Sequence, residues 1–339
     1  MLGKFELNIL LTLDYEVFFG RNTGTVEHTL LEPSAALCKI AEQHGVPLVF
    51  FVDIGFLLRL YEDGKRFPAL MRDYDAVMKQ LAQFVAAGHE LQLHVHSHWE
   101  ESHWNGSDWD VDTRRYRLHD FDGPGIQDIL QRYTNALRNI SGGADVFAFR
   151  AGGWVIQPFE QISEQLRDVG IWLDSTVFAG GTSDSETHQF DFTACPSESH
   201  WCFENDPLVV ASQGGFLEVP IASIKLPPTF YWRLALAKKL GGAIHRSFGD
   251  GSAIPLSRGD MFDKLSHWTT SVVSIDGYKA SFLNKAFDQY KNSGKTDFVV
   301  IGHPKALSRY SLQMLDKFLD THKTENFVGY GVYRGLVPN

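Results

Sequence analysis

The sequence predicts an α/β fold in which parallel strands form a distorted (β/α) barrel. Apolar runs of strand length alternate with segments of helical periodicity, and this alternation indicates βαβ units with a parallel sheet. The 339 residues are enough for one large barrel. Several predicted strands also end in a polar, reactive residue. These residues are Asp14, Asp53, His94, Arg150, Asp174 and His303. Because the carboxyl ends of parallel strands meet at one face of a barrel, where active sites are built, the pattern favours an enzyme.

The predicted elements of the first half alternate as strand and helix. They are strands at 7–13, 46–52 and 90–94 and helices at 32–44 and 73–87. The strands are short apolar runs, whereas the helices carry apolar residues at helical spacing. Pro33 lies near the first turn of the first helix and Gly45 follows its last turn, which are the preferred places of these residues.

The second half continues this alternation with long interruptions. The predicted elements are strands at 146–149, 171–173, 216–221 and 298–301 and helices at 128–140 and 159–169. We expect a single catalytic domain over residues 1–339. Inserts around 99–124 and 178–215 are either binding loops over the site or decoration. The part around 229–295 is predicted to be mainly helical, to pack around the barrel and to carry no chemistry.

Composition and charge exclude several classes of partner. The chain is 44% hydrophobic and 21% charged, as is typical of a globular protein. Its formal net charge is −10 and it has no Lys/Arg-rich block, which argues against nucleic acid or an anionic membrane as partner. We expect no transmembrane segment and no signal peptide. The three cysteines lack CxxC spacing, so a reducing cytoplasm is the predicted compartment.

Three histidines lie close together at the end of a predicted strand. His94 and His98 have HxxxH spacing, and two neutral imidazoles at a strand tip can bind one borderline-soft cation. His96 lies between them and is expected to support the ligands or the structure. Single histidines are more often structural residues or surface switches than ligands. The interpretation therefore depends on whether the chain also supplies a carboxylate ligand, a base and an acid.

Taken in order, these segments resemble the motifs of the NodB-homology polysaccharide deacetylases, carbohydrate esterase family 4. Residues 11–16 (Leu-Thr-Leu-Asp-Tyr-Glu) are similar to the family's first motif, a strand ending in Thr-Phe-Asp-Asp-Gly. Residues 88–98 resemble the second motif, a Gly-His-Glu lead-in to HxxxH. Segments similar to the third, fourth and fifth motifs are found at 149–154, 170–177 and 301–304. The resemblance covers roughly residues 5–305 and implies a NodB-like barrel.

One position departs from the family pattern at the implied metal site. Tyr15 stands where the family usually has a metal-binding Asp, and tyrosine is a poor ligand for such a site. The resemblance therefore implies Glu16, His94 and His98 as metal ligands, while Asp14 and Asp53 stay open as alternative carboxylates. The implied cofactor is a divalent metal, zinc in the first place, with cobalt, nickel or manganese as alternatives.

The resemblance also implies catalytic roles for four residues. Asp14 takes the proton of the attacking water, and Arg150 keeps Asp14 ionised and oriented. His303 is the general acid that protonates the leaving amine. Asp174 is expected to orient His303 and keep it protonated.

The implied function is a metal-dependent deacetylase, an amidohydrolase that removes an N-acyl group, acetyl in the first place, from an amino sugar. The substrate is an N-acylated amino sugar or a linked precursor in polysaccharide or surface-glycan biosynthesis. Two alternatives stay open: hydrolysis of a non-sugar C–N bond, such as a cyclic ureide or small amide, and a catalytically silent metal- and glycan-binding barrel. The presence of Asp14, Arg150 and His303 favours an enzyme.

Overall fold

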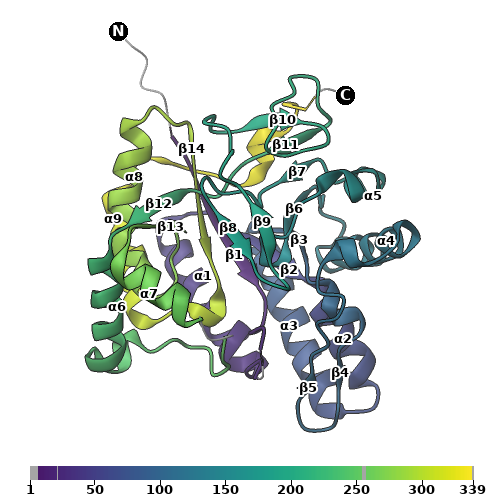
Figure 1. Cartoon of the computed structure of the whole chain (residues 1–339). Helices are drawn as coiled ribbons and strands as arrows, with labels where there is room; N and C mark the ends of the chain where they lie inside the picture. The colour runs from purple at the N-terminus through teal and green to yellow at the C-terminus, as the bar shows by residue number, and fades with distance from the viewer. Residues whose placement is uncertain (1–6, 21, 254–256, 338–339) are drawn as a thin grey trace.

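A curved, mostly parallel sheet forms the centre of the molecule (Figure 1). The computed structural model describes residues 7–20, 22–253 and 257–337. The strand order is β10-β11-β7-β6-β3-β2-β1-β14, and β15 pairs with β1. These strands are β1 (Asn8–Tyr15), β2 (Val49–Asp53), β3 (Glu90–Val95), β6 (Ala148–Ala151), β7 (Leu173–Asp174), β10 (Trp201–Phe203), β11 (Phe216–Glu218), β14 (Asp297–Gly302) and β15 (Asn326–Phe327). Only β10 is antiparallel to its neighbour in this sheet.

The sheet curls back on itself through the chain that follows β11. The amide of Ala222 donates to the carbonyl of Val299 in β14, and Ile221 forms a parallel bridge with the same residue. Ser274 forms a second parallel bridge, with Ile301 of β14. The two ends of the sheet thus approach each other as in a distorted barrel, which confirms the predicted fold class.

Helices flank the sheet on both sides. They are α1 (Glu32–His44), α2 (Ile54–Gly64), α3 (Pro68–Ala86), α4 (Gly123–Ile140), α5 (Ser163–Asp168), α6 (Pro228–Leu240), α7 (Arg258–Ser266), α8 (Leu283–Asn292) and α9 (Arg309–Thr321). In Figure 1, α2 to α5 lie to the right of the central strands and α6 to α9 to the left. The bounds of α1 confirm the prediction, and Gly45 caps it with a φ of 65°. None of the described helices is both long enough and apolar enough to cross a membrane.

The three irregular regions contain more strand than the sequence predicts. The insert at 99–124 holds a hairpin of β4 (His103–Trp104) and β5 (Trp109–Asp110), and that at 178–215 holds one of β8 (Thr182–Asp184) and β9 (Gln189–Asp191). The part at 229–295 contains α6, α7 and α8, but also β13 (Thr269–Val272), which pairs with β12 (Ser223–Leu226). Short helical turns connect several elements. Those at the site are η2 (Ser97–Glu100), η4 (Gly152–Trp154), η7 (Gly277–Phe282) and η8 (Pro304–Ala306).

Candidate active site

The two-residue period of β1 separates two carboxylates from a tyrosine. Successive side chains of a strand point to opposite faces, so Asp14 and Glu16 share one face and Tyr15 takes the other. The Tyr15 hydroxyl donates to Gln80 Oε1 at 2.8 Å, and its ring packs edge-on against Phe50 and Phe84 in the core. Tyr15 therefore belongs to the packing between sheet and helices, whereas Asp14 and Glu16 face the site.

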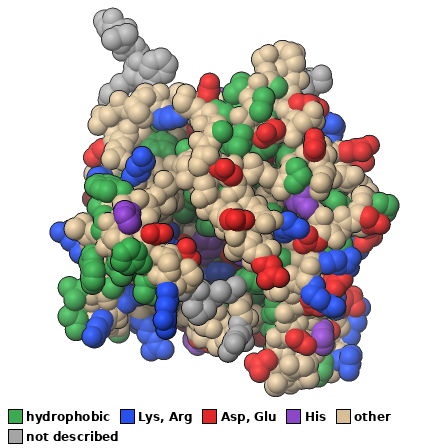
Figure 2. All heavy atoms as spheres, in the orientation of Figure 1, with side chains coloured by type: hydrophobic (Ala, Val, Ile, Leu, Met, Phe, Trp, Pro, Cys, Tyr) green, Lys and Arg blue, Asp and Glu red, His purple; other side chains and the backbone are tan. Residues whose placement is uncertain are grey.

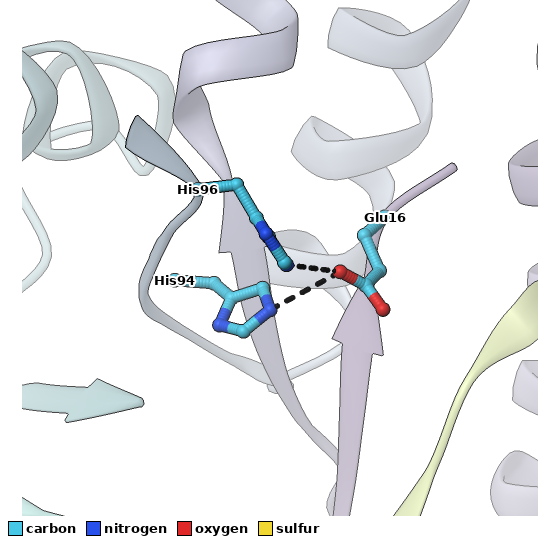
Figure 3. A group of neighbouring side chains, drawn as sticks. All are labelled: Glu16, His94 and His96. Carbon is cyan, nitrogen blue, oxygen red and sulfur yellow. Dashed lines mark hydrogen bonds and ion pairs between the residues drawn. The ribbon is translucent and has the colours of Figure 1, made fainter. Parts of the chain in front are cut away.

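The same period at the end of β3 brings His94 and His96 to Glu16 (Figure 3). Glu16 Oε2 lies 3.3 Å from His94 Nε2 and 2.5 Å from His96 Nε2. One potential ligand atom from each of the three buried residues lies within 4.8 Å of the other two. The structure thus brings together two of the three predicted ligands, Glu16 and His94, and adds His96 to them.

His98 lies outside this group, in contrast to the ligand set that the sequence predicts. It belongs to η2, after β3 has ended, so the alternation that aligns His94 with His96 no longer applies to it. Its ring stacks on Tyr116, with the ring centroids 5.5 Å apart and an angle of 11° between the planes. Burial and the neighbouring His96 hold the pKa of His98 well below its usual range. His98 is therefore a neutral imidazole packed among aromatic rings.

The surroundings of His94 favour positive charge at the site. His94 Nδ1 lies 2.8 Å from the carbonyl oxygen of Arg150, which can only accept, so Nδ1 carries a hydrogen and Nε2 faces Glu16. Burial lowers the pKa of His94, but Asp14 and Glu16 outweigh it and raise that pKa to about 9. His96 Nε2 contacts the Glu16 carboxylate, whereas its Nδ1 has no hydrogen-bond partner among the described residues. The carboxylates thus attract positive charge to the site, and a carboxylate with two imidazoles is a suitable donor set for a divalent metal with open positions.

Lys305 keeps Glu16 ionised. Its ammonium donates to Glu16 Oε1 at 2.9 Å and to the carbonyl of Val17 at 2.7 Å. Burial alone would raise the pKa of Glu16, but the charge of Lys305 and the contacts with His96 and His94 hold it well below its usual range. The strand-end pattern of the sequence does not indicate Lys305, because this residue lies in η8, beyond the end of β14.

Arg150 forms a buried ion pair with Asp14. Its Nη1 donates to Asp14 Oδ1 at 2.6 Å, while its Nε donates to the carbonyl of Ser175 at 2.7 Å. The guanidinium is fully buried and lies over the ring of Phe51, 4.1 Å from the centroid. Asp14 Oδ1 is thereby fixed, and Oδ2 faces the site.

His303 stands beside both carboxylates. Its Nε2 lies 3.7 Å from Asp14 Oδ2 and 3.7 Å from Glu16 Oε1. On the other side, Nδ1 lies 2.8 Å from Asp276 Oδ2, and the His303 amide donates to Asp276 Oδ1 at 2.8 Å. Burial lowers the pKa of His303, but Asp276, followed by Asp14 and Glu16, outweighs it and raises that pKa. The raised pKa favours the protonated form of His303, whose Nε2 faces the site.

Asp276, and not Asp174, is the carboxylate behind His303. Asp174 accepts hydrogen bonds from the amide of Thr176 at 3.0 Å and from its hydroxyl at 2.7 Å. It also contacts Glu218, whose pKa is raised well above its usual range by burial and by Asp174. Asp174 thus orders the turn after β7. Asp276 comes from the region at 229–295 to which the sequence analysis assigned no chemistry.

Asp53, the other carboxylate left open by the sequence, has a structural environment. It is the N-cap of α2, accepting from the amide of Phe56 at 3.4 Å, and it accepts from Trp99 Nε1 at 2.8 Å. Burial raises the pKa of Asp53. The carboxylate that contacts both imidazoles is that of Glu16.

The two long inserts meet beside the imidazoles. The Tyr116 hydroxyl, from the first insert, lies 3.1 Å from Nε2 of His188 in the second. Both rings lie against Gly153 of η4, where a Cβ atom would come within 2.5 Å of His188 and 2.6 Å of Tyr116. The next residue, Trp154, has a φ of 60°, which is rare for a bulky side chain. Both inserts thus form part of the wall of the site.

Comparison with known proteins identifies the fold. No family model matches the sequence, and no curated protein matches it. A candidate polysaccharide deacetylase from Mycobacterium smegmatis aligns with a TM-score of 0.50 and 15% identity, over 98% of this chain and 90% of that one. A 4-alpha-glucanotransferase from Thermococcus litoralis aligns with a TM-score of 0.50 and 14% identity, over 97% of this chain and 40% of that one. Puue allantoinase aligns with a TM-score of 0.48 and 14% identity, over 98% of this chain and 90% of that one.

At these sequence identities, the structural similarity shows the fold only. What the protein does must be inferred from the residues of the site. The chain has the NodB-like distorted barrel of the polysaccharide deacetylases, and at one end of it a buried group of Glu16, His94 and His96 that can bind a metal ion.

Proposed function

We propose that this protein is a metal-dependent deacetylase that removes an N-acyl group, acetyl in the first place, from an amino sugar. The observation that carries the proposal is the meeting of three functions at one face of the barrel. Glu16, His94 and His96 form a group that can bind a metal, Asp14 is an oriented carboxylate, and His303 is an imidazole with a raised pKa that lies 3.7 Å from Asp14 and Glu16.

Glu16, His94 and His96 are the proposed ligands of a divalent cation, with zinc in the first place. Such an ion, when bound, supplies Lewis acidity that polarises the amide carbonyl and lowers the pKa of a water from about 15.7 to about 7. The contact of His94 Nδ1 with the Arg150 carbonyl would leave Nε2 of the same ring available to hold the ion.

Proton transfer is assigned to Asp14 and His303. Asp14 takes the proton of the attacking water at Oδ2, because Arg150 occupies Oδ1. As the C–N bond breaks, His303 donates its Nε2 proton to the leaving nitrogen, which departs as an amine while the acyl group leaves as a carboxylic acid. Asp276 keeps His303 protonated for this step. General acid and base groups each contribute typically about 10²–10⁴-fold to the rate.

The charge of Glu16 favours amide hydrolysis over transfer of a glycosyl group. Glycosyl transfer of the usual kind needs two carboxyl groups, of which one is protonated to act as an acid. Glu16 is held ionised by Lys305 and two imidazoles, and Asp14 is bound to Arg150. The group whose raised pKa suits it to be the acid is instead the imidazole of His303, which faces the leaving nitrogen of an amide in this proposal.

Release of acetate or formate from N-acylated amino sugars tests the proposal. The purified protein is incubated with Zn²⁺, Co²⁺, Ni²⁺ or Mn²⁺ and with a panel that includes cyclic ureides and small amides. We expect metal-dependent turnover of an amino sugar and loss of it in His94→Ala. A His94→Ala protein as active as the metal-loaded wild type would contradict the site. Turnover of only a ureide or a simple amide would favour a hydrolase of non-sugar C–N bonds. Tight glycan binding without any product would favour a catalytically silent barrel.

A further inference from the structure

A large basic cavity adjoins the proposed active site. It has a volume of about 800 Å³ and lies between α6, the chain that follows it, η7 and η8. Lys305 and Asp276 line this cavity and also contact Glu16 and His303. A ligand in the cavity therefore lies next to the residues that hold the metal and donate the proton.

Positive charge dominates the lining of the cavity. Five Lys or Arg residues and a single acidic residue, Asp276, line the cavity, and Asp276 is already paired with His303. The five are Lys238, Lys239, Arg246, Lys279 and Lys305. Lys305 binds Glu16, whereas the other four side chains make no ion pair or hydrogen bond with any described residue. The chain as a whole has a net charge of −10, so the cavity is positive against the overall charge.

Lys279 has a positive charge that no described carboxylate pairs with directly. Its side chain is half-buried, and burial together with the nearby Lys264 lowers its pKa against the opposing charge of Asp276. A partly buried ammonium without a paired anion is unfavourable. An anion bound in the cavity would remove that cost and would also pair with the neighbouring cations of α6. In Figure 2, Lys and Arg side chains lie along the lower left of the visible face, where Figure 1 shows α6.

We propose that this cavity binds a phosphate or diphosphate group of the substrate, so that the enzyme deacetylates a phosphoryl-linked amino sugar. The inference rests on the proposed function and specifies its substrate. Lysine and arginine clusters are the usual partners of phosphate groups. The volume is in the range of small-molecule sites and accommodates a sugar diphosphate. With the phosphates among the cations, the sugar lies toward Lys305 and His303.

Two sources share this chemistry, a nucleoside diphosphate and a lipid-linked diphosphate. The second is included because large apolar side chains are exposed beside the cavity, on α6, on α7 and just after α7 (Figure 2). They are Trp232, Leu236, Leu240, Met261, Phe262 and Trp268. The experiment therefore tests the shared phosphoryl chemistry and separates the two sources.

One N-acetylated amino sugar is offered in four forms: methyl glycoside, 1-phosphate, nucleoside diphosphate and prenyl diphosphate. The proteins are the metal-loaded wild type, Lys239→Gln/Arg246→Gln, and Lys317→Gln/Lys323→Gln as control. The control removes the same charge from exposed lysines on and just after α9, outside the cavity. Values of kcat/KM come from amine release, and calorimetry measures binding of inorganic pyrophosphate to each protein.

For wild type and control, we expect kcat/KM to be at least about tenfold higher for a phosphoryl-linked form than for the methyl glycoside. The cavity variant loses that preference, and its pyrophosphate affinity falls at least about tenfold. A preference for the nucleoside or the prenyl form identifies the source. No preference in the wild type, or an unchanged preference in the cavity variant, overturns the proposal.

Pyrophosphate binding separates the failure of this inference from failure of the proposed function. If no form is deacetylated, the proposed function fails. Even then, pyrophosphate binding that is weaker in the cavity variant, but not in the control, supports the anion site. Equal pyrophosphate affinity in all three proteins overturns the anion site, whatever the enzyme deacetylates.

Discussion

The pKa of His303 is raised because carboxylates lie on both sides of its ring. Asp276 contributes most to the raised pKa, which means that His303 stays protonated up to a higher pH than a free imidazole. In Asp276→Asn the pKa of His303 falls, so the alkaline limb of the kcat/KM profile shifts to lower pH. Above neutral pH, we expect kcat/KM to fall about 10- to 100-fold. The measurement is a pH–rate profile of wild type and variant.

Asp174→Asn is the matched control, because Asp174 contacts Thr176 and Glu218 and not His303. We expect its alkaline limb to coincide with that of the wild type. A shift in Asp174→Asn without one in Asp276→Asn would restore the role that the sequence predicts for Asp174.

His96 and His98 differ in what their rings contact, and metal binding should separate them. His96 lies 2.5 Å from Glu16, whereas His98 stacks on Tyr116. We expect His96→Ala to weaken zinc binding at least about a hundredfold, because it removes a ligand. His98→Ala should keep one zinc per chain and lose stability instead. Metal titration and elemental analysis of both variants provide the test, and the opposite order would favour the HxxxH pair.

Single residues of the site could be predicted where the strand pattern identifies them. Asp14, Glu16 and His94 lie at strand ends, and Tyr15 excludes itself as a ligand by its chemistry. Asp276 and Lys305 could not be found in this way. Asp276 lies in a loop after β13 that has no strand-end pattern of its own, and Lys305 sits in a short turn after β14. Their roles arise from contacts with residues more than 25 and more than 280 positions away, respectively.

At the scale of the elements, η4 packs tightly against the end of β3. A Cβ atom at Gly152 would come within 2.6 Å of both His96 Nδ1 and the carbonyl oxygen of Val95. We expect Gly152→Ala to displace His96, to weaken metal binding and to destabilise the fold by about 1–3 kcal/mol. Denaturant unfolding and metal titration measure the two effects.

Gly123→Ala is a control at an open position. A Cβ atom there meets only Gln165 Nε2, at 3.9 Å, and the residue begins α4. Stability and metal affinity should stay close to wild type. Metal binding by Gly152→Ala that equals that of the control would show that η4 does not position His96.

The positions of helices and strands could be predicted better from the sequence than which histidines of a strand end lie side by side. Helix α1 and the central strands follow from apolar periodicity and from Gly45. The sequence predicts His94 and His98 as a pair because of their i, i+4 spacing. In the structure the strand continues to Val95, so His94 and His96, at i and i+2, lie on the same face. The sequence pattern does not indicate α2, because this helix starts directly after β2, with Asp53 serving both as the strand end and as the helix N-cap.

For the whole molecule, a metal bound to Glu16, His94 and His96 would link β1 to the end of β3. A ligand that binds only the folded state stabilises it, by about 2.7 kcal/mol at a concentration 100 times its Kd. We expect a chelator to lower the Tm and zinc to restore it. His96→Ala should have the Tm of the metal-free wild type, with or without zinc. If the Tm of the wild type stays unchanged after verified metal removal, the metal does not link β1 to β3. Differential scanning calorimetry gives these values.

The curvature of the sheet explains why part of the site lies beyond sequence reasoning. The pairing of β1 with β14, and the bridges of Ile221 and Ser274 to β14, bring the last third of the chain to the first strand. Only this closure brings Asp276, His303 and Lys305 to Asp14 and Glu16. A linear pattern predicts the strands and their polar ends, but not which loops the closure brings over them.

The central claim is that one divalent cation is held by an acidic residue of β1 and two histidines at the end of β3. The most direct measurement is anomalous X-ray diffraction at the zinc edge from crystals of the zinc-loaded protein. We predict a single strong peak about 2.0–2.2 Å from a carboxylate oxygen of Glu16 and from a ring nitrogen of each of His94 and His96. A peak bonded to His98 or Asp53 in place of His96 or Glu16, or no peak at this end of the barrel, would contradict the account.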